Sequence, residues 1–221
     1  MYGKHLLKLQ KYEEAMYNLA SSDYCSPAQV LEPFPDLVPK SLIIAARGLS
    51  DSSSQPRTDF EKLSGDELQK AVAALMPYLL SYRNRIASGE IVVKCKHINE
   101  KSIESLSTLV DTAIVNGLLI LPDNGALLQF LERANSVHFE FTAPKLERDG
   151  RYAELVALLK SSGRHRDAMQ ILRKLSTFEG FTSPPVGAAM ELRGRPGAWA
   201  AIKYLTSITP LDFDLVATHC K

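Results

Sequence analysis

A short phrase that occurs three times constrains the fold of this chain more than any other feature. It appears twice in succession within residues 146–175 and once more near the N-terminus. Each copy has an apolar residue, a polar turn, a ring-bearing residue six positions after the first, a carboxylate, and then apolar residues at helical spacing. Self-similarity of this kind is typical of stacked helical hairpins. The phrase therefore predicts an all-α fold, an α-solenoid of antiparallel helical hairpins without a β-sheet.

The two adjacent copies share one residue, because Leu159 ends the first copy and begins the second. We expect Leu159 to be buried, and Gly150 and Gly163 to form the turns between hairpin arms. The copies consist of Leu6, Tyr12, Glu14, Ala15 and Leu19; of Leu146, Tyr152, Glu154, Leu155 and Leu159; and of Leu159, His165, Asp167, Ala168 and Leu172.

Apolar periodicity predicts a series of helices separated by short turns. Ser64 and Glu67 have the spacing of a capping box, and Ser26, Ser183 and Thr209 each precede a proline and are expected N-caps. Pro77 predicts a kink near residues 73–76. We interpret 89–99 as a loop, and 135–141 as a loop that inserts apolar side chains between helices. The expected helices cover 4–20, 26–32, 40–47, 64–88, 100–121, 123–134, 142–149, 151–162, 165–176, 186–193, 197–207 and 210–220.

The polar composition of residues 48–63 divides the chain. These residues are Ser-rich and aperiodic, and we predict a flexible insert there. A helical-repeat segment (1–47) precedes it, and the helical solenoid (64–221) follows. Because helical patterns reach both ends of the sequence, we expect the chain to be a piece of a longer protein.

Charge and cysteine content narrow the class of protein. Lys and Arg number 26 against 25 Asp and Glu, so no net field attracts nucleic acid, and we predict none as a partner. Cys25, Cys95 and Cys220 are too few and too scattered for a disulfide framework, which favours a reducing compartment. No secretory signal is present, and the most apolar run (113–121) is about half of a membrane span. A cytosolic protein follows.

No arrangement of residues predicts catalysis, a cofactor or a metal. Cys95 with His97, and His219 with Cys220, lack a second ligand pair. His165 stands where the other copies have tyrosine, so we interpret it as a packing residue at a hairpin turn. Residues 194–197 (GRPG) lack the spacing of a phosphate-binding loop. Glu13 and Glu14 are expected to face solvent, and five aromatic residues to lie in the hairpin core: Phe130, Phe139, Phe141, Tyr152 and Trp199.

An ordered series of segments resembles the Vam6/TGF-β-receptor-associated family. No single segment is diagnostic; their order along nearly the whole chain carries the resemblance. They are KYEEAM (11–16), EPFPDLVP (32–39), LSGDELQKAVAALMPYLLSYRNRI (63–86), LVDTAIVNGLL (109–119), RYAELVALLKSSGRHRDAMQIL (151–172), AIKYLTSI (201–208) and DFDLVATHCK (212–221).

The resemblance implies a non-enzymatic scaffold segment of a HOPS-type membrane-tethering subunit, with clathrin-heavy-chain-like repeats and a family domain core at about 105–221. Implied partners are other tethering subunits and a late-endosomal Rab GTPase contacted through the full-length protein. The implied location is cytoplasmic, peripheral and indirect on late endosome, lysosome or vacuole membranes. Two alternatives stay open: an early-endosomal, CORVET-type receptor-associated paralogue, and a tetratricopeptide-like peptide-binding adaptor, although a regular 34-residue period does not recur.

Overall fold

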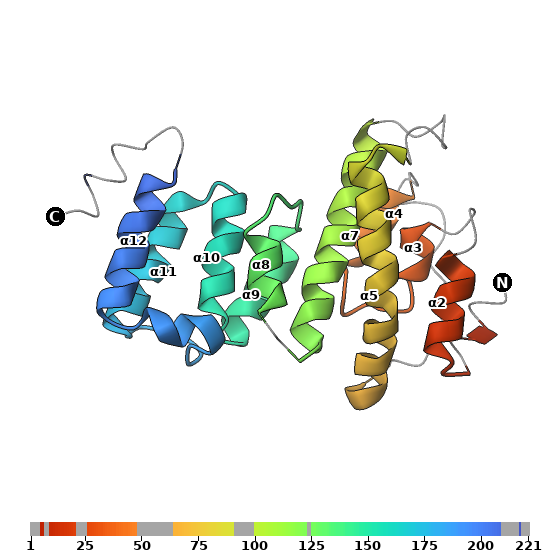
Figure 1. The fold of residues 1–221 in the computed structure, drawn as a ribbon, viewed down its shortest axis with the longest axis horizontal. Helices are drawn as coiled ribbons and strands as arrows, with labels where there is room; N and C mark the ends of the chain where they lie inside the picture. The colour runs from red at the N-terminus through yellow and green to blue at the C-terminus, as the bar shows by residue number, and fades with distance from the viewer. Residues whose placement is uncertain are drawn as a thin grey trace. The chain divides into compact units, whose positions relative to one another are not determined.

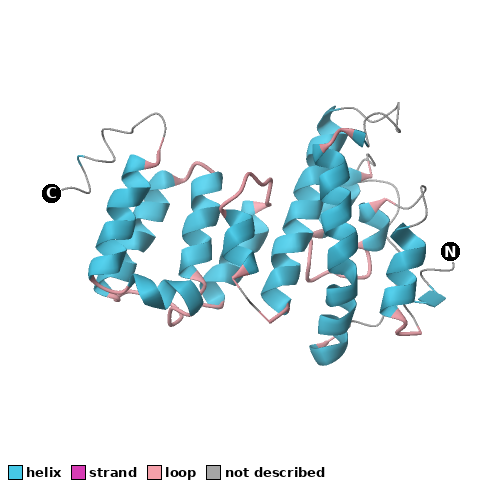
Figure 2. Ribbon diagram, viewed as in Figure 1, coloured by secondary structure: helices cyan, strands magenta, loops and turns pink. Residues whose placement is uncertain are grey.

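The fold of the chain is entirely helical where it is described. The computed structural model describes residues 5–6, 9–20, 26–47, 64–90, 100–122, 125–208 and Ala217, and no strand occurs among them (Figure 2). The all-α prediction is confirmed. The helices are α2 (Tyr12–Ala20), α3 (Pro27–Val30), α4 (Lys40–Ala46), α5 (Gly65–Ala87), α7 (Glu100–Ile120), α8 (Ala126–Leu131), α9 (Phe139–Arg148), α10 (Tyr152–Ser161), α11 (His165–Thr177), the 3₁₀ helix η1 (Gly187–Leu192) and α12 (Arg195–Thr206) (Figure 1).

The chain forms two compact units. Unit 1 consists of Met1–Leu127 with Asn135–His138, and unit 2 consists of Leu128–Ala134 with Phe139–Lys221. The predicted insert at 48–63, the loop at 91–99 and the predicted helix at 210–220 lie outside the described residues, apart from Ala217. The structure therefore tests the hairpins themselves and leaves these segments as predictions.

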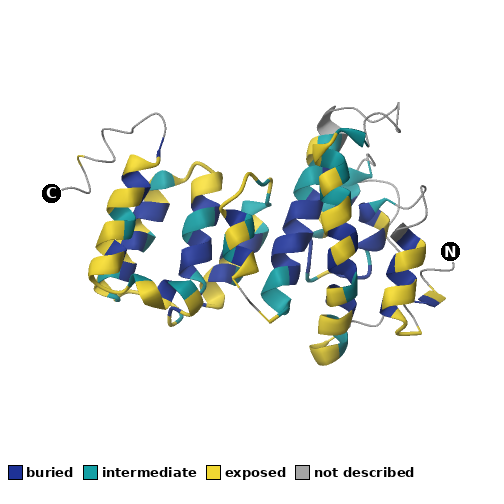
Figure 3. Cartoon of the chain, viewed as in Figure 1, coloured by how far each residue is buried: buried dark blue, intermediate teal, exposed yellow. Residues whose placement is uncertain are grey.

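Unit 1 is built around α7. This helix packs against α5, α4 and α3, and α2 packs against α5. Residues 109–117 of α7 are all buried (Figure 3), as expected for a helix that is apolar nearly all round. By length and composition alone, Ile103–Ile120 is also apolar enough to cross a membrane. The burial of residues 109–117 inside unit 1 explains that composition, because the core helix of a protein meets the same criteria.

Buried polar groups on α7 hold the loop before α9. Asp111 accepts hydrogen bonds from Arg83 Nε at 2.7 Å and from the Ser136 N–H at 2.8 Å. The Thr112 hydroxyl accepts one from the His138 N–H at 2.9 Å. The arginine and the backbone N–H supply the hydrogen bonds that water would otherwise donate to this buried carboxylate. These contacts anchor the 135–138 loop to unit 1.

The three copies of the phrase form the same hairpin turn. The N–H of Arg151, Arg164 and Lys11 donates to the carbonyl of Leu146, Leu159 and Leu6, respectively, at 2.8, 2.9 and 3.0 Å. The residue before each donor has a positive φ: 70° at Gly150, 70° at Gly163 and 59° at Gln10. This is a Schellman turn, which ends one helix and starts the next. The prediction that Gly150 and Gly163 make the turns is confirmed.

The ring in each copy contacts a more distant element. The Tyr12 hydroxyl donates to Glu67 of α5 at 3.1 Å, and the Tyr152 hydroxyl donates to the Ser183 carbonyl at 3.2 Å. His165 Nδ1 lies 2.9 Å from the hydroxyl of Tyr204 in α12. Burial of Tyr12, with the hydrogen bond to Glu67 adding to it, raises its pKa. The ring thus joins each hairpin arm to a later element.

Several predicted helix starts are wrong. The helix expected over 4–20 is broken by the turn at Gln10, and α2 begins at Tyr12. The helix expected from Thr142 begins three residues earlier, at Phe139. The predicted helix at 123–134 is only Ala126–Leu131. These differences arise because the Schellman turn and the anchored loop set the starts, which apolar periodicity cannot locate.

The predicted caps also differ from the structure. Ser64 precedes α5, but its side chain makes no capping hydrogen bond; Glu67 is held instead by Tyr12 and by Lys70 at 3.2 Å. Ser26 precedes α3 without a side-chain cap. The element expected to follow Ser183 and Pro184 is the 3₁₀ helix η1, and its N-cap is Val186.

Candidate functional site

Unit 2 has a groove on its surface. Its volume is about 830 Å³, within the range of ligand and peptide sites. It is bordered by α10, α12, η1 and the end of α8, with Leu172 of α11 also lining it. Helices α10 and α12 both pack against α11, and the groove lies along the faces of α10 and α12 that its lining residues occupy. We call this surface the unit 2 groove.

The lining residues of α10 and α12 follow the same helical register. Ala153, Val156, Ala157 and Lys160 line the groove from α10, and Ala200, Lys203, Tyr204 and Ser207 line it from α12. Each residue of the second set follows its counterpart in the first by 47 positions. The two helices therefore present equivalent faces to the groove, with small residues at the first position and a lysine on each helix.

One polar part of the groove lining, which we call the polar wall, contains Lys160, Tyr204 and Ser207. Lys160 Nζ donates to Ser207 Oγ at 2.8 Å and lies 5.7 Å from the centre of the Tyr204 ring. His165, which does not line the groove, lies with its Nδ1 2.9 Å from the Tyr204 hydroxyl. Burial raises the pKa of Tyr204 to about 12. Tyr204 is thus neutral over the physiological pH range.

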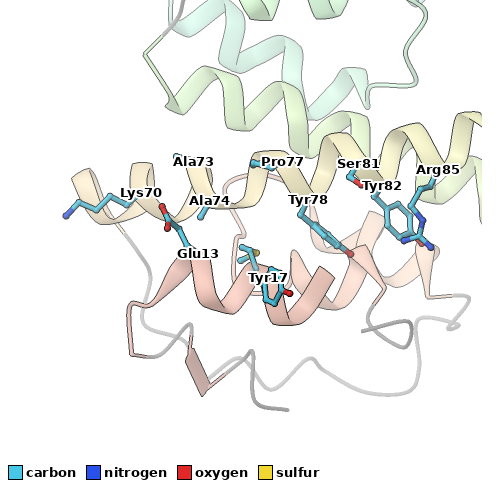
Figure 4. A pocket seen from close by; sticks show the side chains of 11 residues that line it. Glu13, Tyr17, Lys70, Ala73, Ala74, Pro77, Tyr78, Ser81, Tyr82 and Arg85 are labelled. Atoms are coloured by element: carbon cyan, nitrogen blue, oxygen red, sulfur yellow. The ribbon is translucent and has the colours of Figure 1, made fainter. Parts of the chain in front are cut away.

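A second groove lies between α2 and α5 in unit 1. It has a volume of about 650 Å³ and is lined by three tyrosines, Tyr17, Tyr78 and Tyr82 (Figure 4). Arg85 lies over the Tyr82 ring, 5.6 Å from its centre. Tyrosine and arginine are enriched at protein interfaces. Pro77 also lines this groove. Helix α5 continues on both sides of Pro77 without interruption.

The structure describes only some of the residues considered for chemistry from the sequence. Cys95, His97, His219 and Cys220 lie outside the described residues. Within the described residues, no group of three or more His, Cys, Asp or Glu side chains could hold a metal ion. His165 packs against Tyr204, with ring centres 6.0 Å apart, as predicted.

The GRPG segment has a packing role. A Cβ atom on Gly197 would lie 2.2 Å from the Leu192 carbonyl oxygen and about 3 Å from the Ser176 backbone. Gly197 therefore allows α12 to pack closely on η1 and α11. Gly194 has a φ of 71° and is the N-cap of α12. The segment starts a helix and is explained without a phosphate.

The prediction for the five aromatic residues is only partly right. Tyr152 is buried, with 3% of its surface exposed, whereas Phe130, Phe139 and Phe141 are half-buried. Phe139 and Phe141 stack with Arg164 and Lys145 at 4.0 and 3.8 Å. The prediction for Trp199 is wrong, because this residue of α12 has 69% of its surface exposed. Helical spacing shows that a residue lies on one stripe but not whether a neighbouring helix covers it.

Sequence reasoning did not find the unit 2 groove. Its walls come from elements that are separated by up to about eighty residues, and no local motif marks them. The available signal was the pair of alanines at Ala153 and Ala157, one helical turn apart, together with the 47-residue register. Small residues at such spacing leave room above a helix.

These features define a class of protein: helical hairpins with surface grooves. The family model for vacuolar sorting protein 39 domain 1 matches residues 110–221, about half of the chain. The chain belongs to the vacuolar sorting protein 39 family.

Curated relatives agree with this assignment. The chain is 28% identical to the vacuolar protein sorting-associated protein 39 homolog of Drosophila melanogaster, over 81% of the chain and 19% of that protein. It is 27% identical to the Vam6/Vps39-like protein of Mus musculus, over 78% of the chain and 19% of the relative. Vacuolar sorting protein 39 of Arabidopsis thaliana is 23% identical over 79% of the chain and 23% of its own length. The chain spans about a fifth of these relatives, and no solved structure matches it.

Proposed function

We propose that this chain is a scaffold segment of a membrane-tethering subunit that acts in vacuolar sorting. It binds other proteins through the surfaces of its helical hairpins and performs no catalysis. The observation that carries the proposal is the match of residues 110–221 to the family. These residues include α10, α11 and α12, which border the unit 2 groove. A helical-repeat array offers an extended surface of this kind to protein partners.

The finer proposal concerns the complex and its membrane. We propose a HOPS-type subunit that acts in fusion at late endosomes, lysosomes or the vacuole. Its partners are other tethering subunits, and the full-length protein contacts a late-endosomal Rab GTPase. The protein is cytoplasmic, and its membrane association is peripheral and indirect. The early-endosomal, CORVET-type paralogue is the alternative within the same class.

A peptide-binding adaptor is the second candidate function, and the unit 2 groove favours it. The groove combines apolar small side chains with Lys160 and Lys203. A peptide bound there would place apolar residues over Ala153 and Ala157 and a carboxylate near the lysines. Two spacings argue against this candidate. The adjacent copies of the phrase are 13 residues apart, and the equivalent groove residues of α10 and α12 are 47 residues apart. Neither spacing is the 34-residue period of tetratricopeptide repeats.

The discriminating experiment is affinity purification of the chain against solubilised endosomal membranes, with partners identified by mass spectrometry. The scaffold proposal predicts recovery of late-endosomal tethering subunits. Recovery of early-endosomal subunits instead would favour the paralogue. Short linear motifs without tethering subunits would favour the adaptor and contradict the scaffold proposal.

A further inference from the structure

The groove between α2 and α5, which we call the unit 1 groove, combines buried and exposed aromatic side chains. Of the residues that line it, Met16 and Tyr78 have 4% and 8% of their surfaces exposed, whereas Tyr17 is 74% exposed. Both helices belong to unit 1 and pack against each other. Figure 4 shows Glu13 at one end of the groove and Tyr82 at the other. Apolar surface that gathers in a groove with a polar rim is typical of an interaction site.

The side chains of the unit 1 groove favour one mode of peptide recognition. The lining includes three tyrosines, a proline and two alanines, and no leucine, isoleucine or valine among the described residues. Aromatic-lined grooves bind proline-rich segments in the polyproline II conformation, which is rigid before binding. An amphipathic helix instead inserts a row of apolar anchors into a hydrophobic groove. The lining therefore fits an extended proline-rich segment better than a helix.

The length of the unit 1 groove suits a short segment of this kind. Lys70 and Arg85 are the first and the last residues of α5 that line it. Their separation along the sequence corresponds to roughly 22 Å of α-helix. A polyproline II helix rises about 3.1 Å per residue, so about seven of its residues span the groove.

The charges of the unit 1 groove favour a basic ligand. Lys70 Nζ lies 3.2 Å from a carboxylate oxygen of Glu67, and Arg85 Nε lies 3.4 Å from one of Glu90. Glu13, the third charged residue of the lining, is exposed and has no ion pair in the part of the chain that the structure describes. The uncompensated charge of the groove is therefore negative and attracts a cation of the ligand.

Pro77 provides a second acceptor in the groove. Because proline has no N–H, the carbonyl of Ala73 lacks the donor that residue 77 supplies in a regular helix. Ala73 and Pro77 are both exposed, and both line the groove. A donor of the ligand can therefore form a hydrogen bond with this carbonyl. Arginine suits a groove with two acceptors, since its guanidinium carries five donors and stacks on aromatic rings.

We propose that the unit 1 groove binds a proline-rich extended segment of a partner protein, with an arginine of that segment paired to Glu13. The prolines of the segment pack on the tyrosine rings, and the guanidinium donates to the Glu13 carboxylate. All residues that line this groove precede residues 110–221, which the family model matches. The proposal is therefore independent of the role proposed for the unit 2 groove.

Fluorescence anisotropy with fluorescein-labelled peptides tests this proposal. The probes RPPAPPAP and PAPPAPPR cover both orientations in the groove. EPPAPPAP reverses the charge of the first probe, and RGGAGGAG keeps the charge on a flexible chain. The unmodified chain is compared with Glu13→Gln, with Tyr17→Ala and with Glu14→Gln. Glu14 is the matched control, because it is an adjacent exposed carboxylate that does not line the groove. Circular dichroism verifies that every variant stays helical.

The expected result is saturable binding of RPPAPPAP or PAPPAPPR to the unmodified chain and to Glu14→Gln. Glu13→Gln and Tyr17→Ala should each weaken this binding by about tenfold, the loss expected for one charge-assisted hydrogen bond or one aromatic contact. Three results overturn the proposal. They are no binding of either arginine probe at about millimolar concentration, equal affinity for RGGAGGAG or EPPAPPAP, and equal affinity of Glu13→Gln and Glu14→Gln for the arginine probes.

Discussion

At the scale of single residues, Gly150 and Gly163 make the same turn in different surroundings. Both have a φ of 70°. A Cβ on Gly150 would overlap the Pro184 carbonyl oxygen, whereas a Cβ on Gly163 would meet nothing within 4 Å. The Gly150 carbonyl also accepts the Val186 N–H at 2.9 Å. Gly150 therefore forms the turn and also contacts the segment before η1 closely.

Alanine at these two positions should separate strain from overlap. Gly163→Ala should lower the free energy of unfolding by about 1–2 kcal/mol, which is the cost of a left-handed non-glycine residue. Gly150→Ala should cost roughly 2–5 kcal/mol, because the chain before η1 must also move. Chemical denaturation of the two variants checks this prediction. Equal losses would show that the segment around Pro184 does not pack on the turn.

Leu159 joins two copies of the phrase and is 3% exposed. Leu159→Ala should therefore destabilise unit 2 by roughly 2–5 kcal/mol, through lost burial and the cavity that remains. Met190→Ala in the same unit is the control, since Met190 is 52% exposed and its loss should cost less than about 0.5 kcal/mol. An unchanged melting temperature for Leu159→Ala would contradict the shared hairpin register.

At the scale of elements, the stability that the contact between α11 and α12 provides should decrease at alkaline pH. The pKa of Tyr204 is raised to about 12, above about 10 in an unfolded chain. A raised pKa means that the stabilisation is complete below pH 10 and is lost as the pH rises toward 12. The free energy of unfolding should fall by up to about 2–3 kcal/mol over this range.

The control for this pH dependence is Tyr204→Phe, which removes the ionisable group and its hydrogen bond to His165. The variant should be less stable than the unmodified chain at pH 8, and its stability should fall less between pH 10 and 12. Urea denaturation at each pH gives the comparison. Parallel curves for the two proteins would show that Tyr204 ionises as freely in the folded state as in the unfolded one.

The sequence allowed most elements to be predicted, for reasons that particular residues illustrate. Helices α7, α10 and α11 have long apolar periods, and glycine turns precede α10 and α11. All three helices lie within one or two residues of their predicted bounds. The start of α9 was missed because Asp111 and Thr112 fix the preceding loop from a distant helix. The unit 2 groove and the exposure of Trp199 depend on which helices become neighbours. Local patterns do not contain that information.

At the scale of the whole molecule, the proposed scaffold role depends on surfaces that bind other proteins. The unit 2 groove combines apolar small residues with a polar wall, and the family domain includes it. A scaffold role then requires that the groove can be blocked without unfolding the chain.

The most direct test is to block the groove in the full-length protein with Ala157→Arg and to quantify co-purifying tethering subunits. Ala157 is half-buried, so the longer side chain can extend into the groove while the fold is kept; an unchanged melting temperature verifies this. Glu179→Ala, an exposed change outside the groove, is the control. The account predicts that Ala157→Arg loses at least one tethering subunit and that Glu179→Ala retains them all. Recovery of every subunit at unchanged stoichiometry with Ala157→Arg would contradict it.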